Sequence, residues 1–251
     1  MSTPAAENET LRLIHRHRSI RRFRPAPLDT ETVRAIVAAA QNTSTSSYSQ
    51  SYTVITVTDP SRRRDMARLA DDQEFVAEAG AFLVWCADLN RHRLACEKHG
   101  QAFHGEGLEA FLMASVDTAL AAQTAMLAAE SMGLGGVYVG AIRQFATEVA
   151  ALLELPDYVY PVFGMALGYP DETPSSRPRL PLDAILHENS YRLEGLPAAL
   201  ETFDSVTADY YAHRSGGTRP ATWTGRMARL FSQPRRPHLR SFLEARGLLL
   251  R

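Results

Sequence analysis

Hydrophobic and polar residues recur along the chain with two different periods, which predict helices interspersed with strands. Val33, Ile36 and Ala40 follow helical spacing after Asp29, a residue type that favours a helix N-terminus, so this segment should form a helix that packs on a core. Residues 81–88 are apolar without alternation, as in a central strand with both faces covered. Further helices are predicted around 66–69 and over 108–132, 144–154, 196–211, 223–231 and 237–247, and further strands over 52–58, over 158–167 and after Gly136.

The segment 108–132 is the longest predicted helix. It is rich in alanine, whose small side chain allows another backbone to approach closely. We expect this helix to be buried nearly all round, as the central pillar of the core or of a dimer interface. Polar residues interrupt the apolar stretch in a way that a membrane-spanning helix tolerates poorly, so no membrane partner is expected. These residues are Glu109, Asp117, Gln123 and Glu130.

Composition narrows the class of protein. The 251 residues are 45% hydrophobic, enough to bury a full core, and 27 basic residues against 28 acidic ones leave a net charge of -1. The chain as a whole is therefore not basic, and its net charge gives no indication of a nucleic-acid partner. Cys86 and Cys96 cannot form a disulfide framework, and residues 1–10 are polar and acidic, unlike a signal peptide. We expect a cytoplasmic protein.

A basic run at residues 15–23 is the first candidate binding site. It contains four arginines, two histidines and a serine, a set of donors suited to a phosphate or another compact dianion. A solvated basic surface is the alternative, because charge runs usually face water. Ile20 and Phe23 lie within the run and need burial, so part of it should pack against the body of the protein.

Three other segments have a composition suited to ligands. Residues 41–50 are polar and rich in hydroxyls, as in a flexible linker or in a loop facing a polar ligand. The sequence Arg177-Pro178-Arg179 offers a second anion clamp, or an ordinary polar loop. The glycines of 133–140 allow main chain to pass close to a flat ligand. They follow a helix and precede a strand, which is the reverse of the dinucleotide-binding order.

His92, Cys96 and His99 have helical spacing that would suit a metal, with His104 beyond them. Structural zinc requires four ligands, and basic residues surround these three. We therefore expect a partly exposed helix and no metal.

Five short segments of the chain occur in the order found in one family of flavoproteins. The chain resembles FMN-dependent nitroreductases, and most of all the NADPH-preferring oxygen-insensitive nitroreductases and FMN reductases. The resemblance implies an α+β nitroreductase-like fold, with a central mixed sheet between helices, and an intertwined homodimer with two FMN sites at its interface. Residues 1–194 would form the FMN-binding core, and residues 195–251 a helical extension that contacts the partner subunit and covers the active site. The motifs are residues 17–21, 43–47, 133–138, 177–181 and 187–191.

The resemblance also implies two clusters around the FMN phosphate. His17, Arg18 and Ser19 match family positions near the phosphate and the ribityl chain. Arg177 and Arg179 match a second phosphate clamp, so one ligand would account for both basic segments.

The remaining cofactor positions implied by the resemblance surround the flavin ring. They comprise a basic residue beside the pyrimidine, a hydroxyl-bearing loop from the other subunit, a ring-edge amide, and a segment lying against the ring near N5. Where the family often has a second glycine in that segment, this chain has alanine. In the same order, the residues are Arg21; Thr45, Ser46 and Ser47; Gln73; and Tyr138, Val139, Gly140 and Ala141.

Arg214 and Arg219 match positions associated with the 2′-phosphate of NADPH, although as a bare sequence they are loop arginines. The implied activity is NADPH-dependent, with NADH possible as donor. Nitroaromatics, quinones or flavins would be reduced by ping-pong hydride transfer through FMN, without a catalytic triad. Another flavin reaction on the same fold, such as reductive dehalogenation or biosynthetic tailoring, would keep the FMN residues. A non-enzymatic nucleic-acid-binding or regulatory protein using residues 15–24 is the remaining alternative.

Overall fold

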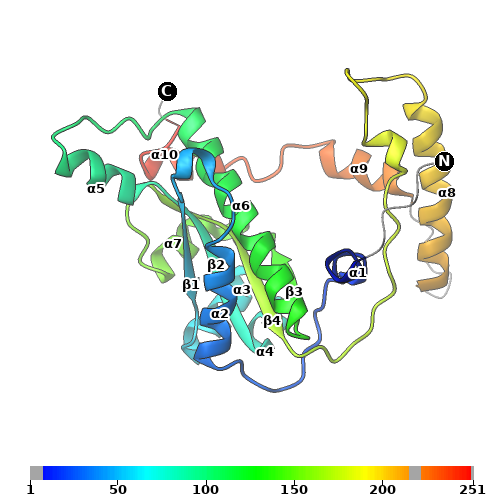
Figure 1. Cartoon of the computed structure of the whole chain (residues 1–251), viewed down its shortest axis with the longest axis horizontal. Coiled ribbons are helices and arrows are strands. Elements are labelled where there is room, and N and C mark those ends of the chain that lie inside the picture. Colours follow the sequence, from blue (N-terminus) through cyan, green and yellow to red (C-terminus); the bar gives the residue numbers. More distant parts are fainter. Residues whose placement is uncertain (1–7, 215–221, 250–251) are drawn as a thin grey trace. The chain divides into compact units, whose positions relative to one another are not determined.

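The computed structural model describes residues 8–214 and 222–249, which form two compact units (Figure 1). The first unit extends to Pro174 and takes up the chain again from His238, and the second is Ser175–Pro237. The predicted division of roles at 194/195 concerns cofactor and partner contacts, and it stays a prediction.

A four-stranded sheet forms the centre of the first unit. Its order is β1 (Tyr52–Thr56), β2 (Ala81–Asp88), β4 (Val159–Gly168) and β3 (Gly135–Val139). All three pairings are antiparallel. The resemblance implied a mixed sheet, but among the described residues the parallel component is limited to an isolated bridge between Ser19 and Gly136.

Helices cover both faces of this sheet, which explains the unbroken apolar sequence of β2. Leu83 and Trp85 point to the face covered by α2 (Thr30–Ala40) and α6 (Leu108–Ser131). Phe82 and Val84 point to the opposite face. Because successive side chains of a strand alternate between the two faces, and both faces are covered, every residue of β2 is buried, as predicted. The opposite face is covered by α3 (Pro60–Leu69), α4 (Phe75–Glu78), α7 (Ala146–Leu152) and α10 (Leu239–Ala245).

Two helices of this unit begin at aspartate caps, and the sequence predicted the one at Asp29. Asp29 Oδ1 accepts a hydrogen bond from the amide of Thr32 at 2.7 Å, and Asp59 Oδ1 accepts one from the amide of Arg62 at 2.8 Å. Each bond satisfies an amide that the helix itself leaves unpaired. The predicted helix 144–154 corresponds to α7. Its first two residues belong to a preceding 3-10 segment, η2 (Gly140–Phe145), and α7 ends two residues earlier than predicted. The remaining elements of this unit are α1 (Glu9–Arg16), η1 (Ser46–Tyr48) and α5 (Asn90–Lys98).

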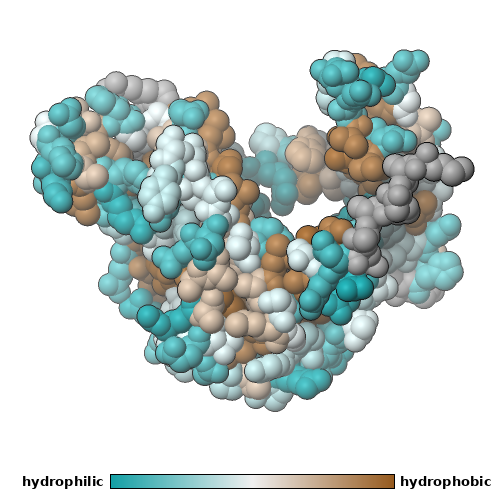
Figure 2. All heavy atoms as spheres, viewed as in Figure 1, coloured by the Kyte–Doolittle hydropathy of each residue, from teal (hydrophilic) through white to brown (hydrophobic). Residues whose placement is uncertain are grey.

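One face of α6 remains open, so the prediction of burial nearly all round is wrong for the single chain. Its inner face packs on the sheet, whereas Leu108, Leu112, Val116 and Leu120 are between 45% and 56% exposed. Their spacing of four places them in one stripe, and Figure 2 shows apolar surface along this part of the molecule. By length and composition alone α6 is apolar enough to cross a membrane. In the fold it is a core helix with buried polar side chains, including Asp117.

The second unit contains η3 (Leu182–Ala184), α8 (Leu196–Arg214) and α9 (Trp223–Phe231), at the predicted positions of the two helices. Asp204 on α8 holds the start of α9, because its Oδ1 accepts a hydrogen bond from the amide of Thr224 at 2.8 Å and its Oδ2 binds the Thr224 hydroxyl. The amide of Trp223 donates to the hydroxyl of Thr207 at 3.1 Å.

The hydrogen bonds from Thr224 hold the pKa of Asp204 below its ordinary value, which predicts acid sensitivity of the contact between α8 and α9. The contact should be complete above about pH 4, the pKa of an unfolded aspartate, and should weaken as the pH falls through the lower pKa of the folded protein. Hydrogen exchange of the α9 amides, corrected for intrinsic rates, should show this loss in the wild type. In Asp204→Asn protection should already be reduced at neutral pH, whereas Asp209→Asn, an exposed α8 control, should match the wild type. Full protection in Asp204→Asn would contradict the assignment.

Candidate functional site

The basic run is docked on the edge of the sheet. After α1 the chain becomes extended, and the amide of Ile20 donates to the carbonyl of Gly136 at 3.0 Å. Ile20 is 5% exposed, and Phe23 forms a bridge with Pro170 beyond the end of β4. The prediction that these two apolar residues hold part of the run against the body is confirmed. The run therefore lies beside β3 in a defined position.

The guanidinium group of Arg18 forms its hydrogen bonds with main-chain carbonyl oxygens. Its Nη1 donates to the carbonyl oxygens of His15 and His17 at 3.2 and 2.7 Å, and no carboxylate pairs with it within residues 8–214 and 222–249. Arg16, Arg18 and the main chain of residues 133–135 line a cavity of about 450 Å³. A cavity with two guanidinium groups and glycine-rich main chain suits an oxyanion.

Two carboxylates line the same cavity, and both have partners. Glu130 Oε1 lies 2.6 Å from Nδ1 of His17. Glu172 Oε1 accepts hydrogen bonds from the amides of Arg21 and Arg22 at 2.5 and 3.0 Å. The carboxylates thus position the basic run without neutralising Arg18. Sequence reasoning assigned neither to the site and named Glu130 only as a polar interruption of an apolar stretch, because the two come from α6 and from the chain after β4.

The hydroxyl-rich segment is a tightly held loop and not a flexible linker. Asp117 of α6 accepts hydrogen bonds from the amide of Ser46 at 3.0 Å, the hydroxyl of Ser49 at 2.8 Å and the amide of Ser51 at 3.2 Å. Asp117 is 1% exposed. Sequence reasoning noted this residue only as evidence against a membrane span. The sequence did contain a signal for this role, because a single acidic residue among the small residues of a core helix needs hydrogen-bond donors from another segment.

The loop and the basic run contact α6 at different points. Asp117 and Glu130 are thirteen residues apart on this helix, which corresponds to about 20 Å along its axis. Thr45, Ser46 and Ser47 are therefore anchored far from the contact between His17 and Glu130 in the same chain.

The predicted ring segment follows directly from the strand that binds the basic run. Tyr138 of β3 donates its hydroxyl to Gln123 Oε1 at 3.2 Å, and its ring meets Phe163 edge-on at 5.1 Å. Burial raises the pKa of Tyr138, so its hydroxyl stays protonated at neutral pH. Val139 ends β3, and Gly140 and Ala141 begin η2. The structure thus brings residues 138–141 to the same edge of the sheet as Ser19.

Gln73 follows two residues with left-handed backbone, Asp71 (φ 68°) and Asp72 (φ 54°). Its side-chain amide donates to the carbonyl of Ala70 at 2.5 Å, which fixes the direction of the amide group. Gln73 is half-buried at the start of the turn that leads into α4.

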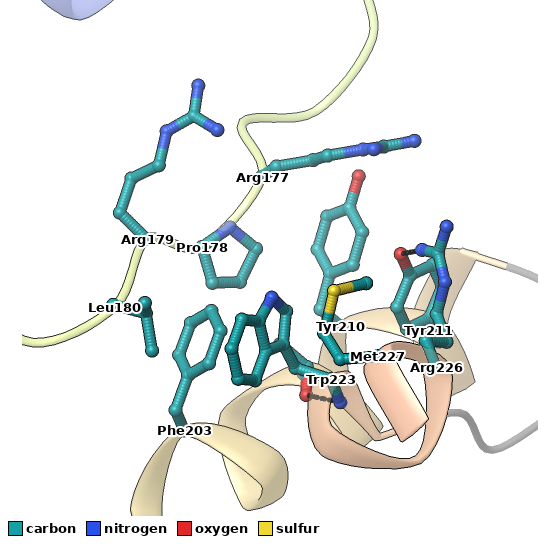
Figure 3. Close-up of a pocket in the computed structure, with 11 residues that line it drawn as sticks. Arg177, Pro178, Arg179, Leu180, Phe203, Tyr210, Tyr211, Trp223, Arg226 and Met227 are labelled. Carbon is teal, nitrogen blue, oxygen red and sulfur yellow. Dashed lines mark hydrogen bonds between the residues drawn. The ribbon is translucent and has the colours of Figure 1, made fainter. Parts of the chain in front are cut away.

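The second arginine pair lies in the second unit. Arg177 and Arg179 flank a cavity of about 320 Å³ whose wall is aromatic. Figure 3 shows Pro178 above Phe203 and Trp223, with the two guanidinium groups extending to either side. In the part of the chain that the structure describes, neither guanidinium group forms a hydrogen bond or an ion pair. The loop therefore presents two positive charges that are available to an anion.

Two further predictions concern metal and nicotinamide ligands. The ring of His92 is used by the hydroxyl loop, since its Nε2 lies 3.0 Å from the carbonyl oxygen of Ser49. Within the described residues no group of three or more histidine, cysteine or acidic side chains is arranged to hold a metal ion. Arg219 and the side chain of Arg214 lie outside the described residues.

Comparison with known proteins decides the family. The model described as "Nitroreductase family" matches residues 14–169, and "Nitroreductase family, C-terminal domain" matches residues 177–251. The chain belongs to the nitroreductase family. Among curated relatives of this nitroreductase, FMN reductase (NADPH) from Bacillus subtilis is 39% identical over 96% of the chain and 98% of the relative. Oxygen-insensitive NADPH nitroreductase from Salmonella typhimurium is 40% identical over 95% and 97%.

A solved structure confirms the nitroreductase-like fold. NfrA1 of B. megaterium has a TM-score of 0.94 and 41% sequence identity, covering 96% of this chain and all of that one. The family resemblance and the α+β fold class predicted from the sequence are both confirmed.

Proposed function

We propose that this nitroreductase is an FMN-dependent NAD(P)H oxidoreductase that reduces small-molecule acceptors. The observation that carries the proposal is the docking of Arg18 beside the glycine-rich start of β3, where no carboxylate of the described residues pairs with it. An oxyanion bound by Arg18 would lie next to glycine-rich main chain that a flat ligand could approach closely, which supports the proposal. The names of the two curated relatives include FMN or NADPH and support the same activity.

The residues present fit FMN. A phosphate requires charged donors that no carboxylate occupies, and Arg18, Arg177 and Arg179 meet this requirement within the described ranges. His17 and Ser19 would add donors to the phosphate and ribityl chain. Residues 138–141 would lie against the ring, with Gln73 at its edge and Arg21 beside its pyrimidine.

FMN, when bound, supplies the redox chemistry by taking a hydride from reduced nicotinamide and passing it to an acceptor. The residues of the chain would bind the cofactor and orient it. Arg21 supplies a positive charge where negative charge develops on reduction. Tyr138 keeps its proton and its bond to Gln123, which holds β3 in place. No side chain is required as a catalytic acid or base, and the proposed acceptors are nitroaromatics, quinones and flavins.

Absorbance spectroscopy tests the proposal directly. The purified protein should be yellow, and NADPH should bleach it under anaerobic conditions. A panel of nitroaromatics, quinones and free flavin should then restore the colour at rates that rank the acceptors. A protein that is colourless after incubation with FMN and removal of the unbound flavin would exclude the proposed function. A yellow protein that NADPH does not bleach would exclude NADPH as its donor.

We also propose a homodimer that pairs the open stripes of α6. Leu108, Leu112, Val116 and Leu120 form an apolar strip that one chain leaves uncovered. A second copy would cover it and would bring the hydroxyl loop of one chain to the flavin of the other. The separation of loop and basic run along α6 supports this arrangement. Residues 195–251 would contact the partner subunit and cover the active site.

We also propose a cytoplasmic location. Both cysteines are free thiols, which is consistent with a reducing compartment.

Leu112→Glu should weaken this dimer, because a two-fold interface would bury the new charge twice. Sedimentation at micromolar concentration should show a shift toward the monomer together with lower FMN content. Leu94→Glu, at an exposed leucine of α5 outside the stripe, should remain dimeric. A Leu112→Glu protein with the mass and flavin content of the wild type would contradict the assigned interface.

A further inference from the structure

The loop that contains Ser46 and Ser47 has an unusual backbone. Three of its non-glycine residues adopt left-handed conformations, namely Ser47 (φ 50°), Tyr48 (φ 58°) and Gln50 (φ 53°). Such conformations are costly for residues with a Cβ, and they persist when surrounding contacts determine them. The shape of this loop must therefore be imposed from outside the loop.

Asp117 supplies most of that constraint. One carboxylate oxygen binds the amide of Ser46, and the other binds the hydroxyl of Ser49 and the amide of Ser51. These contacts bracket the left-handed residues on both sides. The carboxylate is buried on α6 and forms no ion pair among the described residues, so three hydrogen-bond donors from one loop compensate its charge.

His92 of α5 makes a second contact from another direction. Its Nε2 lies 3.0 Å from the carbonyl oxygen of Ser49 and 3.5 Å from the hydroxyl of Ser51. Since a carbonyl only accepts, Nε2 carries the hydrogen and donates it to Ser49. The hydroxyl of Ser51 in turn donates to that of Ser49 at 2.9 Å, which links the two anchors.

We propose that Asp117 is a positioning residue that holds Ser46 and Ser47 in the orientation required by the flavin, with His92 as a secondary anchor. This inference rests on the proposed function. Asp117 does not touch the flavin in this proposal, and it acts through the loop. An ionised carboxylate is required because every group facing it donates. In asparagine, one oxygen would be replaced by an NH₂ group that opposes these donors.

The test compares Asp117→Asn with the wild-type holoenzyme. Hydrogen exchange of the peptide spanning 43–51 should become faster, the Kd for FMN should rise at least about tenfold, and the visible circular dichroism of the residual bound flavin should change. A merely structural role of Asp117 would lower the thermal stability without changing the dichroism of flavin that remains bound.

Thr118→Ala is the matched control. Thr118 is the next residue on α6, is fully buried, and donates its hydroxyl to the carbonyl of Ala114 in its own helix. Its replacement removes a hydrogen bond within the helix and none to the loop among the described residues, so exchange in 43–51 and FMN affinity should stay at wild-type values.

The outcomes separate this inference from the proposed function. Unchanged exchange in 43–51, or faster exchange with unchanged FMN affinity and dichroism, would overturn the role of Asp117.

The double variant Ser46→Ala, Ser47→Ala tests the cofactor role of the loop itself. Unchanged FMN binding in that variant would overturn both the loop's assigned contact and this inference, while a yellow, NADPH-reducible enzyme would leave the activity standing. Should Asp117→Asn fail to fold, His92→Ala must show the same changes in smaller measure, and wild-type behaviour would overturn the inference.

Discussion

Arg18→Ala and Arg179→Ala are each expected to purify as folded proteins that carry much less FMN than the wild type. Each guanidinium group is expected to donate to the phosphate dianion, and loss of one charge-assisted hydrogen bond costs about 1.5–3 kcal/mol, or about 10- to 150-fold in Kd. The fold should survive, because neither side chain pairs with a carboxylate in the described residues, and Arg18 binds only carbonyl oxygens nearby in sequence.

Flavin content per chain and the Kd for FMN, measured by fluorescence quenching on the apoprotein, check this expectation. Arg34→Ala is a suitable control because it removes the same charge from the exposed side of α2. It should bind FMN as the wild type does. Full flavin occupancy in both the Arg18 and the Arg179 variants would show that the phosphate is bound elsewhere. Loss of flavin in one variant alone would show that only that arginine binds the phosphate.

The double variant Arg214→Ala, Arg219→Ala is expected to lose the preference for NADPH over NADH. The assignment comes from the family resemblance, which places these arginines at the 2′-phosphate. The KM for NADPH should rise at least about tenfold with little change in kcat, because a contact remote from the hydride stabilises ground state and transition state alike. The kinetic constants for NADH should stay close to those of the wild type.

Salt provides an independent check on the same arginines. An exposed guanidinium–phosphate contact is screened over roughly 10 Å at 0.1 M ionic strength. The advantage of NADPH in kcat/KM should therefore shrink as salt rises, while the value for NADH changes little. Equal use of both nucleotides by the wild type, or an NADPH preference that survives in the double variant, would contradict the assignment.

Local features of the chain were predictable from the sequence because neighbouring residues decide them. Asp29 caps the helix that follows it, and the apolar run of β2 is buried on both faces. Ile20 within the basic run predicted its docking on the body. Hydrogen bonding within one turn and side-chain alternation in a strand require no knowledge of distant segments.

Contacts between distant segments had to await the fold. Asp117 was visible in the sequence only as a polar interruption of an apolar helix, yet it determines the shape of a loop 66 to 71 residues earlier. Glu130 reaches His17 across 113 positions, and Glu172 reaches Arg21 across 151. The open stripe of α6 was equally hidden, since apolar residues lie on both its inner and outer faces. Composition and spacing record which residues can be buried or charged, whereas only the packing of α6 against the sheet decides which face is covered and which partners its acids meet.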